Sequence, residues 1–177
     1  MRSLRRQLLR TLTLTLLAVF ITQGFVLYGA LVHLATSQTL LHLSHDSESV
    51  LSAIDVDGKG QLTLDEQRVE SVYRHPGSGQ YFLVLIQGGG RLASGSLGTH
   101  GLEARVPGPG QSLDYEAQGP DGYPLKVLAR SSVVQGRPVT LLVAEDMSLA
   151  RQEIWETGLL SLAVFAPLLA LALLLQG

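Results

Sequence analysis

Two long apolar runs, one near each end of the chain, predict two membrane-spanning helices. The first covers residues 11–32 and has no formally charged side chain. The second covers residues 157–177 and is apolar on every face of a helix. Each run has about the 20 residues that a helix needs to cross a ~30 Å hydrocarbon layer. We therefore expect transmembrane helices at 11–32 and 157–177, with a folded domain at 33–156 between them.

The basic residues at the start of the chain set the expected orientation. Four arginines lie within residues 1–10, and positive charge tends to stay on the cytoplasmic side. A cleaved signal peptide also begins with basic residues, but its apolar region is usually only ~7–15 residues long. We therefore expect an uncleaved anchor in the bacterial inner membrane, with residues 1–10 in the cytoplasm and residues 33–156 in the periplasm.

The first part of the middle domain has a helical pattern. Leu43, Val50 and Ile54 share one helical face, so the first helix is predicted to leave the membrane and continue as an amphipathic stem. This stem is expected to end at the turn 57–60, whose two glycines accept positive φ angles. A short second helix is predicted over 65–73.

The second part of the domain reads as strands separated by turns that are rich in glycine and proline. Asp146 stands where it would cap a last helix that begins at Met147 and continues into the second apolar run. Strands bracketed by helices indicate an α+β domain with an antiparallel sheet. The predicted strands cover residues 81–87, 91–96, 112–118, 125–134 and 138–145.

The distribution of charge narrows the possible functions. The formal net charge is −2, yet all 15 acidic residues lie between Asp46 and Glu156. An acidic middle domain argues against nucleic acid as a partner, because phosphate binding needs a basic surface. The chain has no cysteine, which excludes a disulfide scaffold, a thiolate metal site and a cysteine nucleophile.

One segment of the domain resembles the calcium-binding loop of an EF-hand. Asp55, Asp57 and Glu66 stand at loop positions 1, 3 and 12, which carry oxygen ligands in that motif. Lys59, however, places a cation at position 5, where a further oxygen ligand is required. A plain Asp-Gly turn on a solvated surface is the alternative, and it is the interpretation that we favour.

A second hypothesis for a divalent metal concerns the stem helix. His42, His45 and Asp46 share a helical face at the spacings i, i+3 and i+4, which suits two imidazoles and a carboxylate around an ion such as Zn²⁺. The alternative is a polar helix face in solvent or at a dimer seam.

The sequence offers no catalytic residue and no cofactor site. It lacks a nucleophile elbow, a zinc-protease motif and a phosphate-binding loop. Arg74, Arg91 and Arg105 are candidates for binding an anionic ligand in a sheet-lined pocket, because the guanidinium group suits carboxylates. Ordinary surface charge is the equal alternative for these three arginines.

Three segments of the middle domain together resemble bacterial two-component sensor histidine kinases, in particular those whose sensor region lies between two membrane spans. The segments are 45–51 (HDSESVL), 73–82 (YRHPGSGQYF) and 136–146 (GRPVTLLVAED). The resemblance implies a PAS-like periplasmic sensor domain and a homodimer in the membrane. It also implies a cytoplasmic autokinase that uses ATP and phosphorylates a response regulator. These 177 residues contain no counterpart of the kinase domains, so we expect an input fragment or an unusually short relative.

The function expected from the sequence is therefore the detection of an unknown periplasmic ligand and the transmission of that signal across the membrane. Two alternatives stay open. The first alternative is the input domain of another receptor class, such as a chemoreceptor or a diguanylate cyclase. The second is a non-enzymatic envelope protein. An envelope protein of this kind would bind partners through the sheet edge or the loop 98–110.

Overall fold

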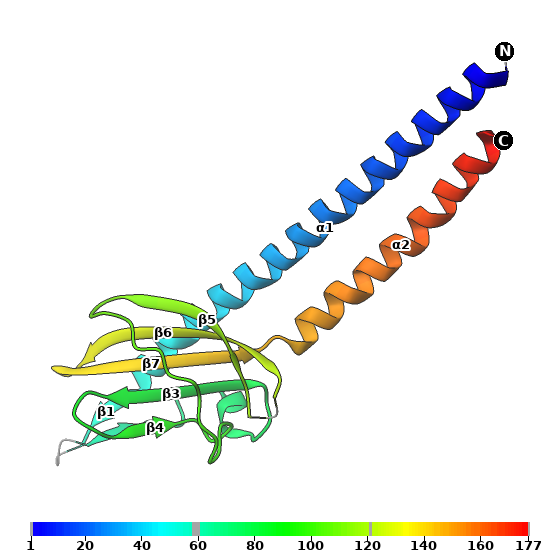
Figure 1. The fold of residues 1–177 in the computed structure, drawn as a ribbon. Coiled ribbons are helices and arrows are strands. Elements are labelled where there is room, and N and C mark those ends of the chain that lie inside the picture. The colour runs from blue at the N-terminus through cyan, green and yellow to red at the C-terminus, as the bar shows by residue number, and fades with distance from the viewer. Residues whose placement is uncertain (1, 58–60, 121, 177) are drawn as a thin grey trace. The chain divides into compact units, whose positions relative to one another are not determined.

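The structure is a computed structural model that describes residues 2–57, 61–120 and 122–176 (Figure 1). It divides into two compact units. One unit contains Met1–Thr36 and Leu149–Gly177, and the other contains Ser37–Ser148. The first unit is helical, and the second holds the strands that the structure describes.

The helical unit begins with α1 (Arg2–Ala53), an uninterrupted helix that continues into the second unit. Threonine hydroxyls in its apolar stretch donate to the carbonyl oxygen four residues earlier, as Thr15 and Thr22 do at 2.9 Å. Such bonds satisfy polar side chains where water is absent. Within the part of the chain that the structure describes, one helix is long and apolar enough to cross a membrane. It covers Thr11–Ala53 of α1, and an 18-residue window within it has a mean hydropathy of 1.9 and no buried residue.

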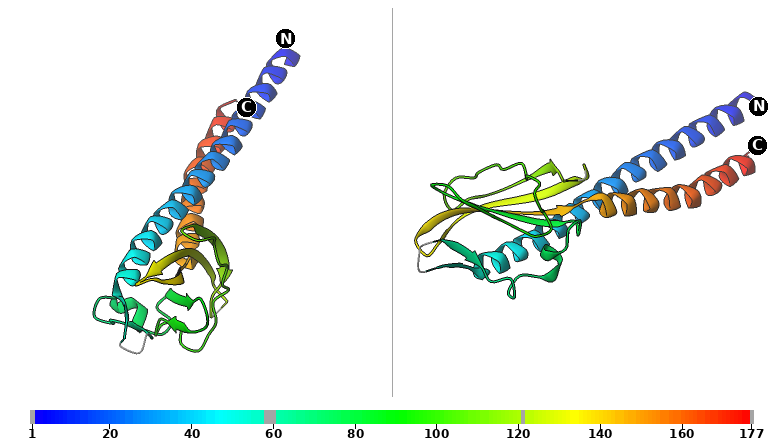
Figure 2. Two further views of the ribbon diagram at one scale, coloured as in Figure 1. Left: turned by 90° about the vertical axis from the view of Figure 1, so that its left-hand side faces the viewer. Right: turned by 90° about the horizontal axis from the view of Figure 1, so that it is seen from below.

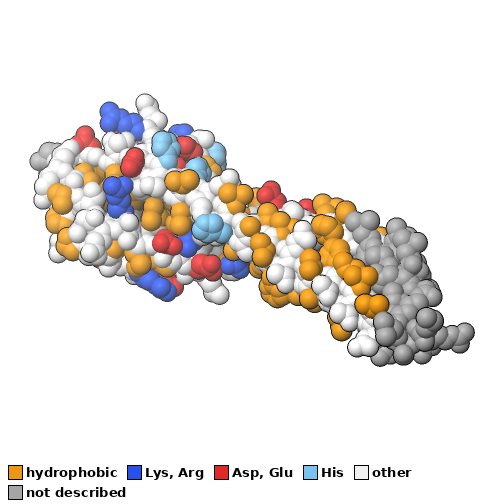
Figure 3. Space-filling model, turned by 90° about the horizontal axis from the view of Figure 1, so that it is seen from above, with side chains coloured by type: hydrophobic (Ala, Val, Ile, Leu, Met, Phe, Trp, Pro, Cys, Tyr) orange, Lys and Arg blue, Asp and Glu red, His pale blue; other side chains and the backbone are white. Residues whose placement is uncertain are grey.

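The second helix of this unit is α2 (Ser148–Gln176), which carries the other apolar run. Phe165 of α2 contacts Phe20 of α1, with ring centroids 5.6 Å apart. Trp155, just before the run, is 71% exposed. Hydrophobic side chains are spread over the described part of both helices, whereas charged side chains gather on the other unit (Figure 3).

Five antiparallel strands form the main sheet of the second unit. Across the sheet they are β4 (Arg91–Ala93), β3 (Gln80–Ile86), β7 (Arg137–Asp146), β6 (Pro124–Val134) and β5 (Ser112–Gln118). The first and last of these strands in chain order, β3 and β7, therefore pair with each other inside the sheet. The α+β class and its antiparallel sheet are confirmed, and each of the five predicted strands lies within three residues of its expected bounds.

The two faces of the sheet have different covers, and the last turns of α1 lie along one of them (Figure 2). On that side the core contains Leu43, Val50, Tyr73, Phe82, Val84, Leu141 and Val143. The opposite face packs under the loop 94–111, which contributes Leu97 and Leu102. Its core also contains Tyr81, Leu83, Tyr115, Val127, Leu142 and Ala144.

The stem helix ends earlier than predicted, because the residues that follow it form a strand. β1 (Ile54–Val56) pairs antiparallel with β2 (Leu62–Leu64), and both Ile54 and Leu62 are buried. Alternating apolar and β-branched residues favour such a half-buried pair over another helical turn. Residues 58–60 of the predicted turn lie outside the described residues.

The prediction of a helix over 65–73 is wrong. The carboxylate of Asp65 accepts a hydrogen bond from the N–H of Gln67 at 3.1 Å, which turns the chain locally. Only a short 3-10 helix, η1 (Ser71–Arg74), follows. Val69 and Tyr73 are both buried, and their spacing of four residues explains the helical pattern in the sequence.

The last strand enters α2 through a single residue, Met147. The carboxylate of Asp146 accepts a hydrogen bond from the N–H of Ser148 at 2.7 Å. Asp146 therefore caps α2 as predicted, although the helix begins at Ser148 rather than at Met147.

Candidate functional site

The last turns of α1 place a carboxyl group inside the core. Leu43 and Val50 are buried, and Asp46 between them is only 1% exposed. The sequence pattern instead assigns Asp46 to the polar face of the helix, together with His42 and His45. That assignment is wrong because the carboxyl group has a polar partner within the core.

The partner is Tyr73 of η1. Its hydroxyl donates to Asp46 Oδ2 at 2.5 Å, and the side chain is fully buried. Its ring meets Phe82 of β3 edge-on, with ring centroids 5.3 Å apart. Burial, followed by the hydrogen bond to Asp46, raises the pKa of Tyr73 well above its usual value of 10. Tyr73 therefore stays protonated and ties α1 to η1.

His42 lies one helical turn before Asp46 and connects α1 with the end of β7. Its Nδ1 lies 3.4 Å from Glu145 Oε2, and its Nε2 lies 3.8 Å from Asp46 Oδ1. Burial lowers the pKa of this imidazole, but neighbouring carboxylates outweigh that effect and raise its pKa above 6.5. They are Asp46, then Glu145, then Glu70. His42 thus lies where a positive charge is stabilised from two elements.

Glu145 belongs to a row of charged side chains that crosses the sheet on its α1 side. The register sets Glu145 opposite Lys126 of β6, and Lys126 opposite Glu116 of β5. Lys126 is only 9% exposed, and its Nζ lies 2.8 Å from Asp114 Oδ2. A nearly buried ammonium group needs such a partner, because an isolated charge is costly away from water. The α1 side of the sheet is therefore apolar at β3 and charged toward β5.

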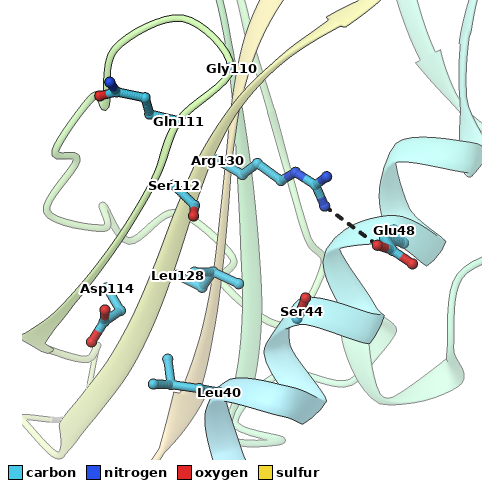
Figure 4. A pocket seen from close by; sticks show the side chains of 9 residues that line it. All are labelled: Leu40, Ser44, Glu48, Gly110, Gln111, Ser112, Asp114, Leu128 and Arg130. Carbon is cyan, nitrogen blue, oxygen red and sulfur yellow. Dashed lines mark ion pairs between the residues drawn. The ribbon is translucent and has the colours of Figure 1, made fainter.

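A groove of about 410 Å³ lies on this charged side, between α1 and the strands β5 and β6 (Figure 4). Arg130 of β6 points toward Glu48 of α1, and its Nη1 lies 3.6 Å from Glu48 Oε1. The two side chains are 40% and 67% exposed, and pairs of this kind contribute little to stability. The groove is lined by Leu40, Ser44, Glu48, Gly110, Gln111, Ser112, Asp114, Leu128 and Arg130.

The metal site predicted on the stem helix does not form as a cluster. Among the described residues, no group of three or more His, Asp or Glu side chains is placed to hold a metal ion. Asp46 and Glu145 approach different nitrogens of the His42 ring, and these nitrogens point in different directions. The third predicted ligand, His45, is exposed.

The EF-hand hypothesis does not fit the local fold. Asp55 lies in a β-strand, Asp57 directly follows it, and the described residues supply no second helix after Glu66. The carboxylate of Asp55 accepts a hydrogen bond from Gln135 Nε2 at 2.6 Å. That of Asp57 accepts one from the N–H of Gln61 at 2.7 Å. These carboxylates thus stabilise the β1–β2 hairpin and its contact with the β6–β7 turn.

The three arginines predicted to bind an anion lie on different elements, and two of them lie at opposite edges of the sheet. Arg91 begins β4 at one edge of the sheet, whereas Arg105 stacks on Tyr115 of β5 at the opposite edge, 4.6 Å from the ring centroid. Arg74 ends η1 and is exposed. The groove contains a different arginine, Arg130.

Sequence reasoning missed Tyr73, Glu145 and Arg130 as site residues. One signal for Glu145 is present in the sequence, because it continues the alternation of Val139, Leu141 and Val143. All three are buried on the α1 side, so a charged residue in phase with them must lie under the helix. Tyr73 and Arg130 give no comparable signal, since their partners are distant in the sequence.

Comparisons with known proteins give no relative. No protein-family model, curated protein or solved structure matches the chain. Function must therefore be inferred from the residues and contacts of this chain.

Proposed function

We propose that this chain is the input module of a bacterial transmembrane sensor. Ser37–Ser148 form the sensor domain, and α1 and α2 transmit its state across the membrane. The observation that carries the proposal is the way both helices join the sheet. α1 runs without a break from the apolar stretch to the buried Asp46, and β7 enters α2 through Met147 alone.

The same two connections also touch each other within the sensor domain. Thr39 of α1 lies 3.6 Å from the sulfur of Met147, and His42 lies 3.4 Å from Glu145. A change in the way α1 packs on the sheet would therefore alter the contacts next to the start of α2. Transmission of this kind requires a signal that binds two arrangements with different affinity.

The membrane topology is part of this proposal. α1 supplies the first span and α2 the second, with the arginines of residues 1–10 in the cytoplasm and the sheet in the periplasm. The exposed Trp155 would then lie at the headgroup boundary, where indole is favoured. Internal hydrogen bonds such as Ser161 to the Thr157 carbonyl, at 2.8 Å, suit a lipid environment.

The identity that we propose for the sensor rests on the motif resemblance. We assign a PAS-like domain, a homodimer, and an output autokinase that phosphorylates a response regulator. The five-stranded antiparallel sheet with a long helix across one face supports the PAS-like assignment. The ATP-using domains of such a kinase have no counterpart in this chain.

The groove beside α1 is the best candidate for the ligand site. It offers one guanidinium group, Arg130, and two carboxylates, Glu48 and Asp114. This set suits a small polar molecule that carries both an anionic and a cationic group. Such a ligand would replace the exposed pair between Arg130 and Glu48, and so move α1 relative to β6.

A fusion of residues 1–177 to the HAMP and kinase domains of a characterised sensor tests the proposal. Autophosphorylation is measured in membrane vesicles for the parent and for Asp46→Asn, which weakens the contact of α1 with Tyr73. The matched control is Glu103→Gln, which removes a carboxylate from the loop-covered side. We expect Asp46→Asn to change the output about fivefold, a modest allosteric coupling, and the control to leave it unchanged.

The same experiment separates the alternatives. A chemoreceptor or cyclase input module would also pass it, because those receptors share the need for transmission. A non-signalling envelope protein would give equal output from the parent, the Asp46→Asn variant and the control. Equal output from folded and inserted fusions would overturn the proposed function.

A further inference from the structure

We propose that His42 is a proton-operated latch between α1 and the end of β7, closed when its imidazole is protonated and released when it is neutral. The latch consists of His42, Asp46 and Glu145. The contacts of the latch are observed in the structure. Only its consequence for signalling rests on the proposed function.

The geometry favours a protonated imidazole, because a carboxylate lies near each of its two nitrogens. One ring nitrogen of His42 faces Glu145 on β7 at 3.4 Å, and the other faces Asp46 on α1 at 3.8 Å. Imidazolium carries an N–H on both nitrogens and a full positive charge, so it attracts both carboxylates. Neutral imidazole has one N–H and no charge, so the attraction to both carboxylates weakens and one nitrogen no longer donates.

Several further polar and charged groups surround the latch. Asp46 also accepts the hydroxyl of Tyr73 from η1, so its carboxylate is held whichever form His42 takes. Glu70, just before η1, adds negative charge on the same side. On the sheet, Glu145 faces Lys126 of β6, whose ammonium group pairs with Asp114 of β5. The proton on His42 is therefore the variable part of the cluster.

The latch lies at the junction that matters for transmission. Glu145 is separated from the start of α2 by Asp146 and Met147 only. The neighbouring contact between Thr39 and Met147 carries no charge, so it persists at any pH. Deprotonation of His42 thus weakens the junction between α1 and the start of α2, while the contact of Thr39 with Met147 remains.

The direction of the effect follows from the raised pKa of His42. Burial lowers this pKa, but Asp46, Glu145 and Glu70 raise it above the ordinary 6.5. A raised pKa in the folded state gives stabilisation that is fully present below 6.5 and is lost as the pH rises through the folded value. Because the imidazole is 43% exposed, the effect is that of a partly solvated ion pair.

The first test is a titration of the histidine ring signals by NMR. The full chain, with ¹³C-labelled histidine, is placed in lipid nanodiscs, and His42→Gln identifies the His42 signal. We expect a pKa above 6.5 for His42 and a downward shift in Glu145→Gln. The matched control, His45→Gln, removes an exposed histidine one turn away and leaves the His42 titration unchanged. A His42 pKa at or below 6.5, or a His42 pKa that Glu145→Gln does not lower, would overturn the latch.

The second test measures hydrogen exchange at the junction itself. The N–H groups of Asp146 and Met147 bond to the carbonyls of Gly79 and Pro124 at 2.8 and 2.9 Å. Exchange of the peptide that covers this junction is compared between parent and His42→Gln at the same pH, which cancels the intrinsic dependence on pH. At about pH 5.5 we expect the parent to exchange roughly two- to fivefold more slowly, and at alkaline pH equally fast. Equal exchange at both pH values would contradict the proposal.

These outcomes are separable from those of the kinase fusion. If the latch tests succeed and the fusion is silent, the proton-linked contact exists but the proposed function fails. If the fusion responds to Asp46→Asn and the latch tests fail, the module signals through another contact.

Discussion

The two faces of the sheet show two different ways of covering the same kind of apolar surface. On the α1 face, the buried carboxyl group of Asp46 meets the hydroxyl of Tyr73, and His42 lies beside it. On the opposite face, the polar side chains under the loop bond mainly to the backbone. Ser96 donates to the Gln80 carbonyl at 2.6 Å, and Tyr115 donates to the Glu103 carbonyl at 2.5 Å.

The two kinds of contact differ in how they depend on pH and on charged ligands. Backbone hydrogen bonds are neutral and keep the same strength over the physiological pH range. Contacts among ionisable side chains change with protonation and with charged ligands. Under the proposed function, the loop-covered face maintains the fold, whereas the helix-covered face would hold the contacts that a signal alters.

The largest expected effects concern the two cores, and they test whether both faces belong to one cooperative unit. Phe82→Ala on the α1 face should cost about 4 kcal/mol, and Leu142→Ala on the loop face about 3 kcal/mol, because both side chains are fully buried. Chemical denaturation of the detergent-solubilised chain, followed by near-UV circular dichroism, measures both losses. Two separate transitions, each sensitive to one variant only, would show that the faces unfold independently.

The next effect compares two tyrosine hydroxyls, one on each face. Tyr73→Phe removes the donor to a buried carboxyl group and should cost about 2 kcal/mol, whereas Tyr115→Phe removes a donor to a backbone carbonyl and should cost about 1 kcal/mol. The raised pKa of Tyr73 adds stability that is lost as the pH rises above its usual 10, so Tyr73→Phe should flatten the alkaline decline. Equal losses for both variants would remove the distinction between the faces.

A smaller effect, below about 1 kcal/mol, is expected for His42→Gln, because the imidazole is partly exposed. The variant should be less stable than the parent below pH 6.5, and the difference should vanish as the pH rises through the raised pKa of His42. Thermal denaturation across this range, with His45→Gln as the control, measures it. A difference that is independent of pH would mean that His42 contributes packing rather than charge.

The smallest effect is expected in the groove. Arg130→Gln should change the free energy of unfolding by less than about 0.5 kcal/mol, because its pair with Glu48 is well exposed. The same denaturation series measures it, with Glu48→Gln as the reciprocal variant. A loss above about 1 kcal/mol for either variant would mean that the pair is a structural contact rather than an available ligand site.

Much of the fold was predictable because its signals are local. The apolar run of α1 and the alternating pattern of the strands can each be recognised within a short stretch of sequence. The five strands of the main sheet lie within three residues of their expected bounds. The β1–β2 hairpin was missed because three residues give too short an alternation to compete with a helical pattern.

The site was only partly predictable because it depends on contacts between distant residues. His42 and Asp46 were selected for metal binding from their spacing, but their observed partners come from η1 and β7. The spacing of Asp46 from Leu43 and Val50 already places it beside the apolar stripe, but its partner Tyr73, 27 residues away in sequence, is not visible in the local pattern. The charged side chain of Asp46, rather than its helical position, therefore led to its assignment to the polar face.

The most direct test of transmission is a distance measurement between α1 and α2 in the presence and absence of the buried contact. The chain has no cysteine, so Leu14→Cys and Leu162→Cys, at positions 66% and 67% exposed, give unique sites for spin labels. Pulsed electron paramagnetic resonance in nanodiscs then compares the labelled parent with the labelled Asp46→Asn variant. An input module predicts a shifted or newly divided distance distribution between the helices when α1 loses its contact with Tyr73. An unchanged distribution in a folded Asp46→Asn variant would contradict it.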